Sequence, residues 1–156
     1  MTATSGNAYV EAWLRHRLVL LELLELIGDE HVNFQPWDEA LPLGKLALHI
    51  ATAGEMFVQT VQAGEFRRTA PVTCENMADV RRVVSERTES TKNALFDLTD
   101  EQLNNVVATA QIFGVDLPGK ALIGAMRDHE IHHKGQLFVY ARMVGVKPPG
   151  FVKRQL

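Results

Sequence analysis

The sequence contains very little cysteine and no long apolar run. Its 156 residues include one cysteine, Cys74, so no disulfide can form within the chain and the fold does not rely on an oxidising compartment. A lone thiol also excludes a zinc site built from several thiolates. The most apolar stretch, residues 18–27, is interrupted by Glu22 and Glu25 and is too short to span a bilayer.

The sequence also shows no targeting segment and no strong charge of one sign. Because no basic segment followed by an apolar run opens the chain, we expect no signal peptide and a cytoplasmic protein. The formal net charge of -3 gives no electrostatic reason to expect nucleic acid or an anionic membrane as a partner. Hydrophobic residues make up 46% and charged residues 22%, a balance that allows a buried core. We expect a single domain over residues 1–156.

Four long segments have the apolar periodicity of amphipathic helices. They cover residues 7–27, 43–63, 76–98 and 118–144. Glycines follow three of these segments, where C-terminal caps are expected, at Gly28, Gly64 and Gly145. No segment alternates with the period of two that a sheet needs. The sequence therefore predicts an all-α fold, a single four-helix bundle with short connections.

Smaller signals lie between these segments. Asn76 is a plausible N-cap for the third helix. Residues 99–102 have the form of a capping box, which predicts a short extra helical turn. Residues 106–114 are β-branched and irregular, and we interpret them as an extended connection and not as a strand of a sheet.

The histidines give the strongest chemical signal. Three of the six lie within residues 128–134. His129 and His133 are four residues apart, so on a helix they are rotated by about 40° and separated by roughly 6 Å, on one face. His132 is about 100° from His133 and cannot easily join that pair. The face is largely apolar, so we expect the pair to point inward; its other members are Leu122, Met126, Gln136 and Tyr140.

A third ligand is available on the second predicted helix. His49 lies on its apolar face between Leu46 and Ala53. Neighbouring helices in a bundle lie about 8–10 Å apart, so His49 can meet His129 and His133 at one ion. Three imidazoles leave a coordination position open, as in catalytic sites, and suit zinc, nickel, copper or iron. The alternative is that these are core histidines hydrogen-bonded to their neighbours.

The same segments resemble a known family. Residues 129–137 (HEIHHKGQL), with YAR at 140–142 and GVKPP at 145–149, resemble the last-helix signature of the DinB/YfiT-like superfamily. Residues 43–51 (LGKLALHIA) resemble its second-helix motif, and the resemblance extends over nearly the whole chain. Lys134 stands where the family often has arginine.

This resemblance implies a four-helix bundle, commonly a homodimer, that holds a divalent metal ion, often nickel or zinc. The ligands would be His49, His129 and His133, with His132 as a spacer. Characterised relatives include transferases and isomerases that use bacillithiol, mycothiol or glutathione. The resemblance thus suggests a metal-dependent transferase of a low-molecular-weight thiol, acting on a small-molecule substrate in stress or detoxification. The alternative is a non-catalytic metal-binding protein of the stress response.

A competing interpretation comes from a short motif. Residues 129–133 also satisfy H-E-x-x-H, the zinc-protease motif in which Glu130 would activate water for hydrolysis. Such a protease needs a further ligand, usually downstream. Only about 23 residues follow His133 and they contain no histidine, so this metal-dependent hydrolase is the least favoured function.

Three further side chains are candidates for a substrate pocket. Arg17 lies on the apolar stripe of the first helix and would attract the carboxylates of a thiol, although a snorkelling side chain at the edge of that stripe is the favoured interpretation. Gln136 and Tyr140 continue the histidine face by one and two turns, where each either lines the pocket or packs between helices. The remaining notable residues are expected at the surface (Cys74, His16 and His31) or in packing contacts (Trp13 and Trp37).

Overall fold

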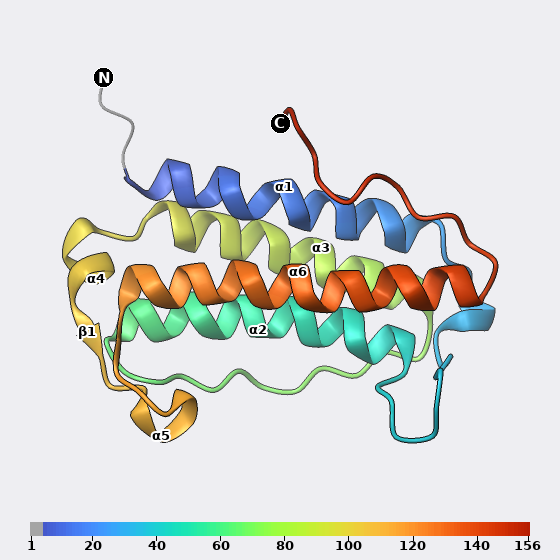
Figure 1. Cartoon of the computed structure of the whole chain (residues 1–156), viewed down its shortest axis with the longest axis horizontal. Coiled ribbons are helices and arrows are strands. Elements are labelled where there is room, and N and C mark those ends of the chain that lie inside the picture. Colours follow the sequence, from blue (N-terminus) through green and yellow to red (C-terminus); the bar gives the residue numbers. More distant parts are fainter. Residues whose placement is uncertain (1–4) are drawn as a thin grey trace.

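Four long helices run side by side along the molecule in the computed structural model, which describes residues 5–156 (Figure 1). They are α1 (Ser5–Glu25), α2 (Leu43–Ala63), α3 (Met77–Phe96) and α6 (Gly119–Met143). The prediction of an all-α fold built on four helices is therefore confirmed. The predicted helix ends differ from these bounds by two residues at most.

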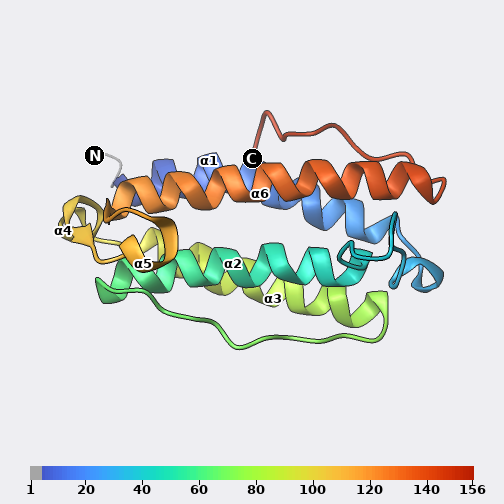
Figure 2. The same ribbon diagram turned by 60° about the horizontal axis from the view of Figure 1, so that its bottom comes forward.

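The four helices form a ring. α2 packs against α6 and α3, and α1 packs against the same two helices from the other side. α1 and α6 run in one direction and α2 and α3 in the other (Figure 1). Because α2 and α3 are consecutive and parallel, residues 64–76 must return along the whole bundle between them, as Figure 2 shows. The prediction of short connections is wrong for this crossover.

Helix ends follow local side-chain chemistry at most of the predicted positions. Asn76 caps α3 by accepting a hydrogen bond from a backbone N–H of the first turn. Thr99 and Gln102 form a capping box that starts the short helix α4 (Asp100–Asn104). Gly64 and Gly145 follow α2 and α6 with φ of 72° and 83°, a conformation that glycine adopts without strain.

The end of α1 differs from its prediction. The helix ends at Glu25, and Gly28 has a φ of -80° and precedes a single 3-10 turn, η1 (Asp29–His31). The backbone N–H groups of Leu26 and Ile27 instead bond to carbonyls three residues back, which tightens the last turn. Gly28 is therefore not the C-terminal cap that the sequence predicted.

The connection before α6 is more structured than expected. β1 (Val106–Val107) pairs with β2 (Leu117–Pro118) in an antiparallel two-stranded sheet, and α5 (Ala110–Phe113) lies between them. Asp116 closes this hairpin because one of its carboxylate oxygens accepts the backbone N–H groups of Thr109 and Ala110. The interpretation of residues 106–114 as a plain extended connection is corrected accordingly.

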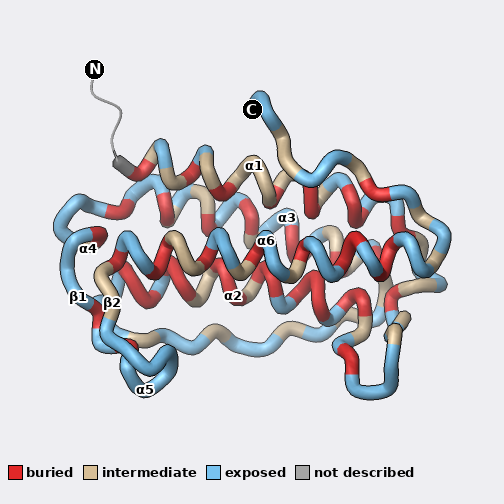
Figure 3. Tube along the Cα trace, in the orientation of Figure 1, coloured by how far each residue is buried: buried red, intermediate tan, exposed pale blue. Residues whose placement is uncertain are grey.

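Buried residues recur along each of the four long helices, between intermediate and exposed ones (Figure 3). They make two apolar clusters, one towards each end of the bundle. Between them lies a polar layer whose members are Arg17, Thr88, Glu130 and Lys134, all buried. No helix within residues 5–156 is long and apolar enough to cross a membrane.

Candidate metal centre

Three histidines meet where α2 faces α6. His49, His129 and His133 each offer one ring nitrogen, and these atoms all lie within 4.8 Å of one another. The Nε2 atoms of His49 and His129 are 3.1 Å apart. Two nitrogens that bind one ion at about 2.0–2.1 Å lie roughly 3 Å from each other. This pair therefore has the spacing of two ligands of one metal ion.

The three rings stand edge to face around a common point. The centroid of His49 lies 4.9 Å from that of His129 and 4.8 Å from that of His133, and the two α6 rings are 4.3 Å apart. His129 and His133 are half-buried, whereas His49 is exposed. The site is therefore open on one side, which leaves room for a further ligand.

The electrostatics favour neutral imidazoles. Burial lowers the pKa of His129 to about 4, and the positive charges of His133, His49 and His132 act in the same direction. Burial also lowers the pKa of His49, assisted by His133, because its ring lies against the other two. Neutral imidazole is the form that binds metal, so the donor set fits a divalent transition-metal ion.

Gln136 orients one of these histidines. Its side-chain oxygen lies 2.7 Å from Nδ1 of His133. An amide oxygen only accepts hydrogen bonds, so Nδ1 carries the proton and Nε2 is free to bind a metal. Gln136 thus contacts His133, one of the three candidate metal ligands, directly. His132 is exposed, and its ring lies beside His133 outside the set of converging nitrogens.

Glu130 is directed away from the histidines, towards α1. One of its carboxylate oxygens accepts hydrogen bonds from Trp13 Nε1 at 2.9 Å and Arg17 Nη2 at 2.7 Å, and the other accepts from Arg17 Nε at 2.7 Å. Both oxygens are occupied inside the bundle. The zinc-protease interpretation, with Glu130 as the base, is therefore wrong.

Arg17 neither lines a pocket nor snorkels. Its side chain is fully buried, pairs with Glu130, and also donates to Thr88 Oγ1 at 3.1 Å and to the carbonyl of Ile50 at 3.4 Å. Its guanidinium lies over the Trp13 ring. A buried charge needs a partner of opposite charge, and Glu130 supplies it. The sequence did not reveal this pair because the partners are 113 residues apart.

Lys134 is a second buried charge on α6. Lysine side chains are mostly exposed in proteins, but Lys134 is only 3% exposed. Its Nζ lies 2.9 Å from Nδ1 of His16 and also donates to the carbonyl of Phe151. Burial lowers the pKa of Lys134 to about 8, although Glu130 opposes that shift. The C-terminal segment thus covers Lys134.

Tyr140 is mainly a packing residue. Its hydroxyl donates to the carbonyl of Leu41 at 3.0 Å, and its ring packs edge-on against Phe34. Trp13 is buried as predicted, but Trp37 is 61% exposed, so its prediction as a packing group is wrong.

The other residues expected at the surface are only partly exposed. His31 lies beside Glu30, with 3.4 Å between Nε2 and the carboxylate, and His16 contacts Lys134. Cys74 packs at the edge of an apolar cluster. Burial and the nearby charge of Asp79 raise the pKa of its thiol, which disfavours a nucleophilic role.

A hollow of about 290 Å³ adjoins His49 on the side of the crossover. Its lining includes Lys45, Thr52 and Thr73. Lys45 is exposed and lies one helical turn before His49, and it forms no ion pair within the described part of the chain. We did not predict this cation from the sequence, although its four-residue spacing from His49 was a usable signal.

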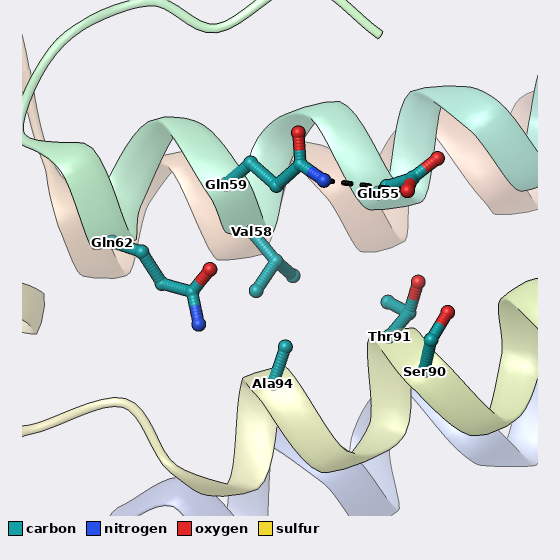
Figure 4. A pocket seen from close by; sticks show the side chains of 7 residues that line it. All are labelled: Glu55, Val58, Gln59, Gln62, Ser90, Thr91 and Ala94. Atoms are coloured by element: carbon teal, nitrogen blue, oxygen red, sulfur yellow. Dashed lines mark hydrogen bonds between the residues drawn. The ribbon is translucent and has the colours of Figure 1, made fainter.

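Another hollow, of about 160 Å³, lies between α2 and α3 (Figure 4). It is lined from α2 by Glu55, Val58, Gln59 and Gln62 and from α3 by Ser90, Thr91 and Ala94. The α2 residues lie on roughly the opposite face of the helix from His49. This hollow is therefore separate from the histidine site.

Four helices in a ring, with three imidazoles converging from α2 and α6, define a helical-bundle protein with a candidate histidine-ligated metal site. The chain belongs to the DinB family, whose model matches residues 1–155.

Known proteins of this kind resemble the chain over most of its length. The uncharacterised protein YjoA of Bacillus subtilis (strain 168) is 34% identical over 140 residues, which cover 90% of this chain and 91% of YjoA. The crystal structure of YjoA covers 95% of this chain and all of its own, with a TM-score of 0.83 and 30% identity.

Two more distant structures share the fold. A DinB-like protein from Bacillus cereus ATCC 10987 has a TM-score of 0.79 at 21% identity and covers 96% of this chain and 99% of its own. YfiT of Bacillus subtilis, described as a probable metal-dependent hydrolase with an unusual four-helix bundle topology, has a TM-score of 0.71 at 12% identity, covering 91% of this chain and 89% of its own.

Proposed function

We propose that this protein is a metal-dependent enzyme that acts on small molecules, with a divalent ion held by His49, His129 and His133. The convergence of three ring nitrogens within 4.8 Å, open to solvent on one side, carries this proposal. A divalent ion in such a site supplies Lewis acidity, which lowers the pKa of a thiol or water that binds it. Nickel and zinc are the ions we propose.

The reaction we favour is transfer of a low-molecular-weight thiol to an electrophile. The chain's own residues would bind and orient the thiol. Gln136 holds His133 in the tautomer that leaves Nε2 available. Lys45 offers an unpaired positive charge one turn from His49, where it would attract a carboxylate of the thiol. We therefore propose Lys45, and not Arg17, as the cation that attracts the carboxylates of the thiol.

A hydrolase is the second candidate, because YfiT is described as a probable metal-dependent hydrolase and shares this fold. In this chain Glu130 is occupied by Arg17 and Trp13, so hydrolysis would need a different base. Hydrolysis of ester and amide substrates, tested beside thiol transfer, separates the two candidates.

The deciding experiment begins with metal analysis of protein purified without a histidine tag. Thiol transfer is then measured with bacillithiol, mycothiol and glutathione against a panel of electrophiles, in metal-loaded and metal-free protein. We expect turnover that requires the metal and is lost in His129→Ala. Full metal occupancy without turnover of any thiol or hydrolytic substrate would contradict the enzyme proposal and favour a binding protein.

The family resemblance also underlies our proposal of a cytoplasmic homodimer. Sedimentation velocity of the untagged protein tests the oligomeric state. A single monomeric species across the micromolar range would contradict it.

A further inference from the structure

An apolar hollow lies beyond the histidines at the C-terminal end of α6. Its volume is about 370 Å³, and its lining consists of Pro36, Trp37, Gln136, Val139, Tyr140 and Met143. We call this hollow the Trp37 pocket. Trp37, Val139 and Met143 are each more than half exposed. Large apolar side chains gathered around a concave surface are typical of a ligand-binding site.

The Trp37 pocket has a rigid floor. Tyr140 is buried there, with its hydroxyl fixed to the carbonyl of Leu41 and its ring 5.8 Å from that of Phe34 at an angle of 81°. Because the hydroxyl is already bonded, the ring presents mainly apolar surface. None of the lining residues is charged. The pocket therefore suits an aryl or short alkyl group and not an ion.

One side chain joins this pocket to the candidate metal centre. Gln136 lines the pocket, and its oxygen lies 2.7 Å from Nδ1 of His133. Tyr140 lies seven positions after His133, which corresponds to about 10 Å along the helix at a rise of 1.5 Å per residue. A small molecule held at the histidines therefore reaches the pocket with an arm of about that length.

We propose that the Trp37 pocket binds the apolar arm of the substrate and so selects molecules that carry an aryl or alkyl group about 10 Å from the atom held at the metal centre. This proposal rests on the proposed function of the histidine site. It assigns specificity to Trp37, Val139 and Met143, which line the pocket together with Gln136. The occupant is a small apolar group of the substrate.

The test uses three thiols of different reach. Mercaptoethanol, phenylmethanethiol and phenylbutanethiol are titrated into zinc-loaded protein, with binding measured by calorimetry and by tryptophan emission, for which the emission of the Trp37→Ala variant gives the part due to Trp13. We expect phenylbutanethiol to bind about tenfold or more tightly than phenylmethanethiol, because only its ring reaches the pocket and is buried there. Its binding should also shift tryptophan emission to the blue.

Two variants and a matched control make the result specific. Trp37→Ala and Met143→Gln should each reduce the preference for the longer thiol to about twofold or less. Both side chains are exposed, so neither change should unfold the chain. Phe96→Ala removes another exposed aromatic ring, 51% exposed against 61% for Trp37, at the far end of α3, and should keep the full preference.

The outcomes separate the pocket from the proposed function. Equal affinity for the two phenyl thiols would overturn the pocket while metal-dependent thiol binding still stood. If no thiol bound, the proposed function would fail. Phenylbutanol would then probe the pocket without any thiol: a shift of Trp37 emission supports an apolar site, and no shift overturns it. A dimer that dissociates in Trp37→Ala would show that a second copy covers the pocket, and would also overturn the proposal.

Discussion

Two pairs of polar side chains on α6 have the same four-residue spacing but opposite surroundings. His129 and His133 face α2, are half-buried, and direct their nitrogens towards one another. Glu130 and Lys134, each one residue further along, face α1 and are buried. A rotation of about 100° separates the two pairs, and this rotation decides which pair meets solvent.

The difference between the pairs lies in their hydrogen bonds. Both oxygens of Glu130 are bonded to Arg17 and Trp13, and Lys134 is bonded to His16 and a carbonyl of the C-terminal segment. This is a closed structural network. The histidines instead keep nitrogens directed at a common point, as a ligand site requires. We call Glu130 and Lys134 the closed pair, and His129 and His133 the open pair. The network of the closed pair also fixes the rotation of α6, and so holds the open pair in position.

The largest expected effect comes from breaking the closed pair. Glu130→Ala would leave the guanidinium of Arg17 buried without a counter-charge, and should lower the free energy of unfolding by about 3–5 kcal/mol. Urea unfolding of the metal-free protein measures this. The matched control is Asp128→Ala, two residues away and exposed, which should change stability by less than about 0.5 kcal/mol. Similar stability of the two variants would refute the closed-network account.

Removing one member of the open pair should have a smaller effect on a different property. His129→Ala or His133→Ala should weaken metal binding by about a hundredfold or more, because even outer-shell changes weaken it by 10–100-fold. Unfolding of the metal-free protein should change little. Metal content after dialysis is the measurement, with exposed His132→Ala as the control. Equal metal loss in that control would overturn the ligand assignment.

His129 should also make stability depend on pH. Since the pKa of His129 in the folded protein is about 4, against 6.5 for an ordinary histidine, the unfolded chain takes up the proton first as the pH falls. Because solvent screens this half-buried ring and reduces the full effect of the shift, the metal-free protein should lose about 1–2 kcal/mol of stability as the pH falls from 6.5 to 4. His129→Gln should flatten this part of the stability profile, measured by urea unfolding across the range. An unchanged profile would contradict the assigned cause.

The two pairs also differ in how far the sequence revealed them. The spacing of His129 and His133, and the position of His49 between Leu46 and Ala53, predicted which histidines the structure brings together, although His49 is exposed. The roles of Glu130 and Lys134 escaped prediction because their partners, Arg17, Trp13 and His16, lie more than a hundred residues away. The apolar periodicity of the first helix places Arg17 on its stripe. The partner of Arg17, which is Glu130, follows only from the packing of α1 against α6.

The fold shows the same limit. Helix bounds depend mainly on neighbouring residues, so the sequence predicted them within two residues at most, although the cap predicted at Gly28 was wrong. The parallel order of α2 and α3 depends on the path of residues 64–76, which carry no periodic signal. The hairpin around Asp116 likewise depends on pairing across α5. Contacts distant in sequence were the part that local patterns could not supply.

The smallest effect we predict concerns Gln136, which belongs to the open side and touches His133. Gln136→Leu keeps the shape of the side chain but removes the acceptor for Nδ1, so both tautomers of His133 become available. Metal affinity should fall by about tenfold, with no comparable change in the unfolding of the metal-free protein. Gln136→Glu restores an acceptor and should recover the affinity. If the leucine and glutamate variants bound metal equally well, Gln136 would serve only the neighbouring pocket, and the orientation of His133 would have to come from packing against His49 and His129.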